Sequence, residues 1–198
     1  AAIELAAEVA EDYGVVVVNA GSGTREHPTQ ALLDLYTIQQ RHGSIDGKRI
    51  VLVGDLKRGR TVRSLAQLFC QYDVELVLAA PERLQLEPDV LDKLTAAGVP
   101  WRQTDTLEVD ADVVYLTRVQ DEWDEGHGQG HPPTDPRFVF GMEQLARLPE
   151  HASVMHPLPK RDEVTPEVCA TRDARLAWWE QVKNGLVVRA ALLETLLN

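Results

Sequence analysis

The chain has 198 residues, of which 44% are hydrophobic and 26% charged, a composition typical of globular proteins with room for one or two domains. Its 31 acidic and 20 basic residues give a net charge of −11, which argues against a general nucleic-acid or anionic-membrane binder. Cys70 and Cys169 are too few for a disulfide framework, no apolar run could span a membrane, and the first residues lack a signal peptide's basic start, so we expect a cytoplasmic protein.

Predicted helices and buried strands alternate along the chain. In chain order we expect a helix over 1–12, a strand at 15–19 (VVVVN), a helix from Pro28 to about Arg41, a strand at 49–55, a helix at 59–72, a strand at 74–80, a helix at 87–98, a strand at 112–120, a short strand at the start of 153–164, and helices near 173–182 and 185–197. This alternation predicts an α/β fold in which helices flank a parallel sheet. Ligands of such sheets bind beyond the carboxyl ends of the strands.

Residues 121–140 (DEWDEGHGQGHPPTDPRFVF) are expected to form a loop, because they are rich in Gly, Pro and His. His127 and His131 raise the alternative of a metal site. A Gly-rich loop more often only carries solvated side chains, so we expect no metal there.

Four segments place polar side chains just after predicted strands. They are TREHPTQ, GDLKRGRT, YLTRVQ and HPLPK, and they contain His27, Gln30, Lys57, Arg60, Arg118, Gln120 and His156. Because parallel strands end at one edge of a sheet, we expect these side chains to lie toward one face. This face is the candidate site.

The helix that begins at HPTQ places His27 and Gln30 near its N-terminus, where backbone N–H groups point outward. Together these two side chains can aim hydrogen-bond donors at a substrate carbonyl. The alternative for His27 is a purely structural role as a helix cap or turn residue.

The basic side chains near the strand ends suit a dianionic small molecule. The GDLKRGR segment lacks both glycine-rich nucleotide-binding patterns. Arg60 and Arg118 each follow an apolar strand, and two forked guanidinium groups match two carboxylates. For Lys57, Arg58 and Arg63, a role as surface charges on loops is as well supported as a role in the site.

The segment MHPLP is expected to form a stiff loop, because Pro157 and Pro159 restrict its backbone. His156 within it is expected to be buried and structural. A rigid loop of this kind can present backbone carbonyls to an amine or amide nitrogen.

These motifs resemble those of the aspartate carbamoyltransferases. HPTQALLDLYTI, VGDLKRGRTVRSLAQ, YLTRVQ, MHPLPKRDEV and NGLVVRAALLETLL occur in that family's order, essentially from end to end of the chain. The resemblance implies a Rossmann-like aspartate-binding domain. It also implies transfer of a carbamoyl group from carbamoyl phosphate to the α-amine of L-aspartate, an early step of pyrimidine synthesis, with no cofactor.

The resemblance also implies a role for each site residue. His27 would donate to the carbamoyl oxygen and Gln30 would hold the carbamoyl nitrogen. Arg60 and Arg118 would bind the aspartate carboxylates, with Gln120 orienting them. The backbone carbonyls of Pro157 and Leu158 would meet the nitrogens, and Lys57 is a further candidate.

The chain departs from the family pattern at several points. It contains neither the Ser-Thr-Arg-Thr-Arg phosphate motif nor the lysine loop that a neighbouring subunit lends. Lys160 and Trp123 stand where the family has arginines, and Ser22 replaces an aspartate. We therefore expect the chain to be inactive alone. The alternative function is a non-catalytic carbamoyltransferase-like assembly or regulatory module.

The resemblance implies three parts of the chain. Residues 1–24 are expected to be a remnant of the carbamoyl-phosphate domain, 25–180 the aspartate-binding domain, and 181–198 a helix that packs on the carbamoyl-phosphate domain. The family is built on homotrimers, to which other pyrimidine-pathway or regulatory chains can be added. No nucleic acid or membrane is expected as a partner.

Overall fold

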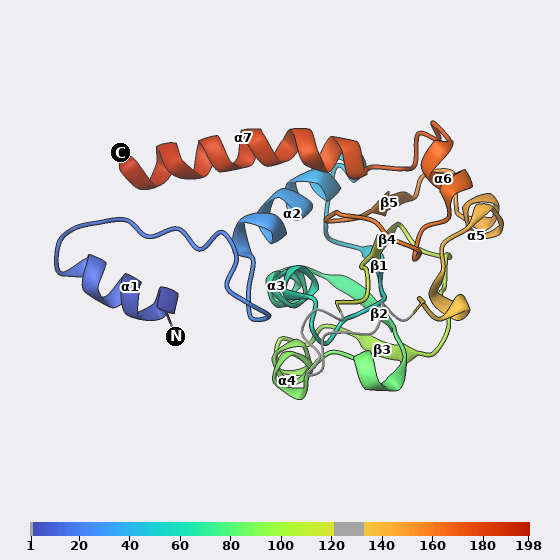
Figure 1. Cartoon of the computed structure of the whole chain (residues 1–198), viewed down its shortest axis with the longest axis horizontal. Helices are drawn as coiled ribbons and strands as arrows, with labels where there is room; N and C mark the ends of the chain where they lie inside the picture. The colour runs from blue at the N-terminus through green and yellow to red at the C-terminus, as the bar shows by residue number, and fades with distance from the viewer. Residues whose placement is uncertain (1, 121–132) are drawn as a thin grey trace.

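The structure is a computed structural model that describes residues 2–120 and 133–198. Figure 1 shows a twisted sheet with helices on both of its faces and a long C-terminal helix along one edge. The elements are α1 (Ala2–Glu11), α2 (Pro28–His42), β1 (Lys48–Val53), α3 (Arg60–Phe69), β2 (Val74–Ala79), η1 (Glu82–Leu84), α4 (Pro88–Ala96), β3 (Trp101–Thr104), β4 (Val113–Leu116), η3 (Pro136–Phe138), α5 (Met142–Arg147), β5 (Ser153–Met155), α6 (Pro166–Ala170) and α7 (Trp178–Leu197).

In the described part of the chain, five parallel strands form one sheet in the order β3-β2-β1-β4-β5. The predicted parallel α/β fold is confirmed. The chain moves outward from β1 to β3 and then crosses back to add β4 on the other side of β1. The strand order therefore reverses between β1 and β4, and ligands of such sheets bind in the crevice at that point.

Two apolar layers hold the helices to the sheet. On one face, α2, α3 and α4 pack on β1 and β2 through buried residues such as Ile38, Leu65 and Phe69. On the other face, η3, α5, α6 and the start of α7 bury Phe138, Leu145 and other apolar residues against the sheet. Strand β4 is fully buried, and β2 is buried except for Glu75, which explains why their sequences are almost continuously apolar.

The prediction of a buried strand at 15–19 is wrong. These residues are extended but belong to no strand of the described structure, and Val15, Val16 and Val17 are exposed. A strand requires a neighbour that accepts its backbone hydrogen bonds, and this segment lies away from the sheet between α1 and α2. Apolar residues in a run like this are usually buried, but no described part of this chain covers them.

The prediction of two closing helices is also wrong, because α7 runs unbroken from Trp178 to Leu197. Gly185 lies inside the helix and is buried against α2. A Cβ atom there would lie 3.3 Å from Leu33 Cδ2, so the glycine permits close helix packing. Strand β3 and the short helices α5 and α6 were not predicted, because segments this short carry little periodicity.

Candidate functional site

The crevice between the ends of β1 and β4 is narrow because of Gly54, which follows β1. A Cβ atom on Gly54 would lie 2.1 Å from the carbonyl oxygen of Thr117, and the residue has a φ of 110°. Only glycine combines this backbone conformation with so close an approach. The segments after the two strands, Asp55–Arg60 and Thr117–Gln120, are thereby brought side by side.

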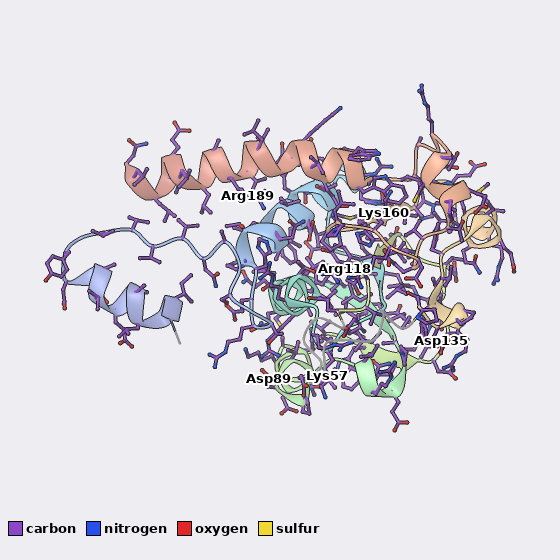
Figure 2. The ribbon with its side chains drawn as sticks, in the orientation of Figure 1. Lys57, Asp89, Arg118, Asp135, Lys160 and Arg189 are labelled. Atoms are coloured by element: carbon purple, nitrogen blue, oxygen red, sulfur yellow. The ribbon has the colours of Figure 1, made fainter. Side chains whose placement is uncertain are left out.

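A cavity of about 170 Å³ opens at this point. It is lined by His27, Gln30, Arg60, Thr61, Thr117, Arg118, Gln120, His156, Pro157, Leu158 and Pro159. Of the residues predicted for the site, all but Lys57 meet in this cavity. Figure 2 shows Arg118 near the centre of the molecule and Lys57 near α4, at the molecule's edge.

His27 stands at the N-cap position of α2 but does not cap the helix with its side chain. Its backbone N–H donates to Ser64 Oγ at 2.9 Å, and its Nδ1 lies 3.5 Å from Thr29 Oγ1. Partial burial lowers the pKa of His27, and the positive charges of Arg60 and Arg189 lower it further. The Thr29 hydroxyl can donate to Nδ1, and a neutral imidazole that accepts this hydrogen bond carries its N–H on Nε2, which suits a hydrogen-bond donor.

Arg60 begins α3 and is placed by the glycine-rich turn before α2. Its Nη1 donates to the carbonyl of Gly23 at 3.2 Å, and a Cβ atom on Gly21 would lie 3.1 Å from its Cζ. Gly21 has a φ of 128°, so the turn combines a glycine-only conformation with room for the guanidinium group. The same turn contains Ser22, whose backbone N–H donates to the carbonyl of Glu26.

Asp55, which sequence reasoning did not single out, ties the two strand ends together. This fully buried carboxylate accepts the backbone N–H of Gln120 at 2.9 Å and both the backbone N–H and Nε of Arg58. Gln120 is thus fixed at the cavity, whereas the guanidinium of Arg58 is engaged behind it. Its position in GDLK, directly after an apolar strand, is the signal that could have identified Asp55.

The remaining basic residues of this region pair with helix α4. Lys57 Nζ lies 3.4 Å from Glu87 Oε1, and Arg63 Nη1 donates to Asp89 Oδ1 at 3.0 Å. Neither residue lines the cavity, which matches the interpretation of both as surface charges.

The loop after β5 forms the opposite wall. His156 is buried; its Nδ1 accepts the backbone N–H of Leu158 at 2.8 Å, and its Nε2 lies 2.9 Å from Glu163 Oε1. Because Nδ1 accepts, the imidazole is neutral and donates from Nε2, and burial lowers its pKa. Leu158 has a φ of 60°, a conformation that costs a non-glycine residue about 1–2 kcal/mol. His156 therefore shapes the loop that also lines the cavity.

Two further cations flank this loop. Lys160 places its Nζ 3.7 Å from the centre of the Trp178 ring, outside the cavity lining. Arg189 of α7 lines an adjoining cavity of about 170 Å³ that shares Gln30, His156, Pro157 and Leu158 with the first. Sequence reasoning missed Arg189, although it belongs to the motif NGLVVRAALLETLL.

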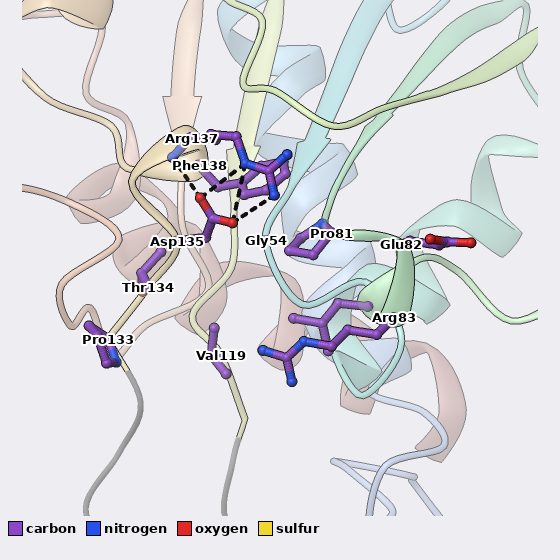
Figure 3. Close-up of a pocket in the computed structure, with 11 residues that line it drawn as sticks. Gly54, Pro81, Glu82, Arg83, Val119, Pro133, Thr134, Asp135, Arg137 and Phe138 are labelled. Atoms are coloured by element: carbon purple, nitrogen blue, oxygen red, sulfur yellow. Dashed lines mark hydrogen bonds and ion pairs between the residues drawn. The ribbon is translucent and has the colours of Figure 1, made fainter.

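A larger cavity, of about 360 Å³, lies on the other side of Gly54 and Val119 (Figure 3). Its lining is of mixed charge, with Glu82 and Asp135 beside Arg83 and Arg137, and Arg137 is paired with Asp135 at 2.8 Å. Size alone therefore does not identify the site, and the smaller cavity has the convergent donors.

The described residues form neither a metal site nor a membrane-spanning segment. Across the described residues, no group of three His, Cys, Asp or Glu side chains could hold a metal ion, and no helix is long and apolar enough to cross a membrane. His127, His131 and Trp123 lie outside the described residues. Cys70 and Cys169 are free thiols.

Comparison with known protein families yields two matches. Residues 46–196 match the family model described as aspartate/ornithine carbamoyltransferase, Asp/Orn binding domain, and residues 2–40 match the carbamoyl-P binding domain of the same family. The chain is 43% identical over 196 residues to the chloroplastic aspartate carbamoyltransferase of Arabidopsis thaliana, and 46% identical over 197 residues to the catalytic subunit of Thermococcus kodakarensis. These alignments span 97% of this chain but 50% and 61% of the two relatives.

Solved structures give the same result. The aspartate transcarbamoylase of Trypanosoma cruzi in complex with aspartate and phosphate aligns with a TM-score of 0.80 and 36% identity, over 94% of this chain and 60% of that one. The catalytic subunit of the M. jannaschii aspartate transcarbamoylase aligns with a TM-score of 0.81 and 35% identity, over 97% and 63% of the two chains. The chain therefore spans about half to three fifths of the length of these relatives.

Proposed function

Because this chain belongs to the aspartate/ornithine carbamoyltransferase family, we propose that it is the aspartate-binding part of an aspartate carbamoyltransferase. The reaction converts carbamoyl phosphate and L-aspartate into N-carbamoyl-L-aspartate and phosphate. The observation that carries the proposal is the single cavity in which donors for a carbonyl and two guanidinium groups for carboxylates converge.

The cavity's basic side assigns the acceptor substrate. Arg60 and Arg118 come from opposite sides of the β1–β4 crevice and bind the two carboxylates of L-aspartate. Gln120, held by Asp55, orients the amino acid between them. A dicarboxylate supplies the charge that these two guanidinium groups require, because charge-assisted pairs are about twice as strong as neutral ones.

The carbamoyl group is assigned to the other side of the cavity. The α-amine of aspartate attacks the carbonyl carbon, forming a C–N bond while the C–O bond to phosphate breaks and the amine loses a proton. His27 donates to the oxygen as negative charge develops on it, and Gln30 accepts from the carbamoyl nitrogen. Backbone carbonyls of Pro157 and Leu158 hold the nitrogens. Because carbamoyl phosphate is already activated, positioning and charge stabilisation suffice, and the proposed reaction needs no cofactor.

The exposed apolar ends of the chain support a second part of the proposal. Residues 1–24 belong to a carbamoyl-phosphate-binding domain, 25–180 form the aspartate-binding domain, and 181–198 pack on the former. Apolar side chains of α1, of 15–17 and of α7 are exposed, and those of Leu5 and Leu186 are more than half exposed. Their exposure supports a domain that covers them. We propose a homotrimer as the assembled form.

Cellular location stays a prediction. The composition and the two free cysteines favour a cytoplasmic protein. The plant relatives are named as chloroplastic, so a plastid is the alternative compartment to test.

Binding of L-aspartate to the 198-residue chain tests the proposal. We expect two-dimensional NMR titration to shift the backbone amide resonances of Arg60, Arg118 and Gln120 with L-aspartate and to leave them unchanged with L-ornithine. Equal responses to both amino acids, or no response to either, would contradict the assignment of this cavity.

A further inference from the structure

A buried carboxylate lies directly behind the proposed carbamoyl site. Asp34, on α2, is fully buried and does not line the cavity. Its Oδ1 accepts hydrogen bonds from Gln30 Nε2 at 3.0 Å and from Gln181 Nε2 at 2.8 Å. Its Oδ2 accepts one from the Tyr115 hydroxyl at 2.7 Å. Three elements, α2, β4 and α7, thus converge on one side chain.

Such a group is costly to bury. Desolvation raises the pKa of Asp34 to about 7, although its three hydrogen-bond donors act in the opposite direction. An apolar side chain at this position of a helix packed on a sheet would avoid that cost. The carboxylate therefore needs an explanation beyond packing.

The first consequence of the carboxylate is a fixed amide orientation at Gln30. Gln30 and Asp34 are four residues apart on a helix and share one face. A carboxylate oxygen only accepts, so the amide must turn its nitrogen toward Asp34. The carbonyl oxygen of Gln30 is then left on the side of the cavity that this residue lines.

This orientation survives protonation of Asp34. The Tyr115 hydroxyl also forms a hydrogen bond with Thr61, so it can accept a hydrogen bond from a protonated Oδ2 and donate to Thr61 instead. Oδ1 then remains a carbonyl oxygen that accepts from both glutamine amides. The direction of the Gln30 amide is the same in both protonation states.

The second consequence concerns the opposite wall. Gln181 donates from Nε2 to Asp34, which turns its Oε1 toward the loop after β5. That oxygen accepts the backbone N–H of His156 at 2.8 Å. One carboxylate therefore orients two amides, of which one faces the cavity and the other anchors the loop with Pro157 and Leu158.

We propose that Asp34 is the positioning residue through which the site selects a carbamoyl group, because it holds the Gln30 amide with its oxygen toward the ligand's NH₂. The inference rests on the proposed function and deepens it. An acetyl group has the shape of a carbamoyl group but carries a methyl in place of NH₂. It would leave the Gln30 oxygen without a donor, and leaving one partner of a buried hydrogen bond unmatched weakens binding by roughly tenfold.

The test compares N-carbamoyl-L-aspartate with N-acetyl-L-aspartate, which share both carboxylates and the carbonyl. Their dissociation constants for the 198-residue chain are measured by NMR titration. We expect the unaltered chain to prefer the carbamoyl ligand by about tenfold. Asp34→Ala should lower this ratio, because the Gln30 oxygen is then no longer held toward the ligand and can find a donor elsewhere when the acetyl ligand is bound.

Two matched variants separate positioning from a general loss of structure. Asp34→Asn keeps an oxygen for the two glutamine amides and should retain the tenfold preference. Tyr115→Phe removes a hydrogen bond from the same buried network but leaves the contact between Asp34 and Gln30, so it should also retain the preference. If Asp34→Ala fails to fold, Asp34→Ser is measured in its place, because a hydroxyl can donate or accept and leaves the Gln30 amide free to turn.

A measurement on the unaltered chain gives an independent outcome. The side-chain NH₂ resonances of Gln30 should be protected from hydrogen exchange and should shift little when either ligand binds, because this group faces Asp34. Large ligand-dependent shifts would overturn the proposal.

An unaltered preference in Asp34→Ala, or equal binding of both ligands by the unaltered chain, would also overturn the proposal but would not contradict the proposed function. Failure of both ligands to bind would reject the proposed function and this inference with it.

Discussion

The body of the sheet and the ends of the chain use apolar residues in opposite ways. In the body, Phe69 and Leu65 are fully buried between sheet and helix. At the ends, Leu186 of α7 is 78% exposed and Tyr13, just after α1, is also 78% exposed. Figure 1 shows that α1 and the C-terminal part of α7 extend away from the sheet on the same side.

Helix α7 contains the boundary between the two regions. Its first turns are part of the body, where Trp178 and Gln181 are buried and Arg41 of α2 pairs with Glu180 at 2.7 Å. From Leu186 onward no apolar residue of α7 is buried, and most of them are exposed. An apolar pattern in a sequence thus indicates burial, but it does not say against which partner. In α7 the first turns are buried against the sheet body, and the rest of the pattern is left for a partner outside the described residues.

The difference between the regions predicts a division of labour. The cavity residues lie on the body, so the body should fold and bind the amino acid. The chemistry needs phosphate-binding donors that the sequence does not contain, and we assign these to the domain that would cover the ends. In the completed enzyme, the N-terminal part of the Thermococcus kodakarensis subunit is joined before this chain.

The largest expected effect is on activity itself. We predict that the 198-residue chain alone has no measurable carbamoyltransferase activity and that the completed enzyme does. Binding of a doubly charged leaving group depends on donors outside the body. Formation of N-carbamoyl-L-aspartate is measured for both proteins at matched concentrations. Turnover of about 1 per second by the chain alone, an ordinary enzymatic rate, would refute the division of labour.

The second prediction concerns the amine that accepts the carbamoyl group. Ornithine carries a cationic side chain, and the guanidinium of Arg118 in a partly desolvated cavity repels it. We expect the completed enzyme to prefer L-aspartate over L-ornithine by at least about 10³ in kcat/KM, equivalent to roughly 4 kcal/mol. Steady-state kinetics with both amino acids measure this ratio.

Arg118→Ala provides the control for that ratio. Loss of a charge-assisted hydrogen bond should raise the KM for aspartate by about 10-fold or more and change the KM for carbamoyl phosphate far less. An Arg118→Ala enzyme with unchanged dependence on aspartate would remove this residue from the carboxylate site.

The third prediction concerns the oxyanion donor. We expect His27→Ala to lower kcat of the completed enzyme by roughly 10²–10³ with a smaller change in KM, as expected for a donor that acts in the transition state. A change confined to thermal stability would instead indicate the helix-cap role. The observed side chain makes no capping hydrogen bond, which argues against that role.

The site could be predicted from the sequence better than the two ends of the chain, where 15–19 and α7 lie. The side chains of GDLKRGRT and TRVQ follow β1 and β4, so the strand order brings them together. His27 and Gln30 of HPTQ reach the same cavity from the start of α2, because 15–19 form no strand in the described structure. Asp55, Asp34 and Gln181 were missed because a buried polar residue is recognised only by its partners. These partners are up to 147 residues away in the sequence, as between Gln181 and Asp34.

The errors in the fold have a common cause. The apolar run at 15–19 was interpreted as a strand because hydrophobicity indicates burial, but no neighbouring strand of the described structure pairs with it. The last helix was predicted as two helices, near 173–182 and 185–197, but it runs unbroken through Gly185. The close packing of Gly185 against Leu33 is a tertiary contact that local propensity does not contain.

The fourth prediction is a shift in the titration of His27. Burial and the charges of Arg60 and Arg189 lower the pKa of this residue below 6.5. Its neutral form is therefore favoured in the folded state, and the stability it contributes is present above pH 6.5 and decreases as the pH falls through the lowered pKa. Arg189→Gln removes one positive charge and should raise the pKa of His27, measured by NMR titration of the imidazole protons. An unchanged midpoint would mean that Arg189 exerts no field at the cavity.

The smallest expected effect separates the two regions most directly. Leu186→Ser changes a 78% exposed side chain and should alter the stability of the 198-residue chain by less than about 0.5 kcal/mol. Leu65→Ala in the body should cost about 2–5 kcal/mol, because Leu65 is fully buried. In the completed enzyme, Leu186→Ser should instead cost about 1–3 kcal/mol, since the side chain is then covered. Denaturant unfolding of the two variants and the unaltered sequence, in both proteins, measures the difference. An equally small effect of Leu186→Ser in both would show that this end of α7 faces solvent in the assembled enzyme as well.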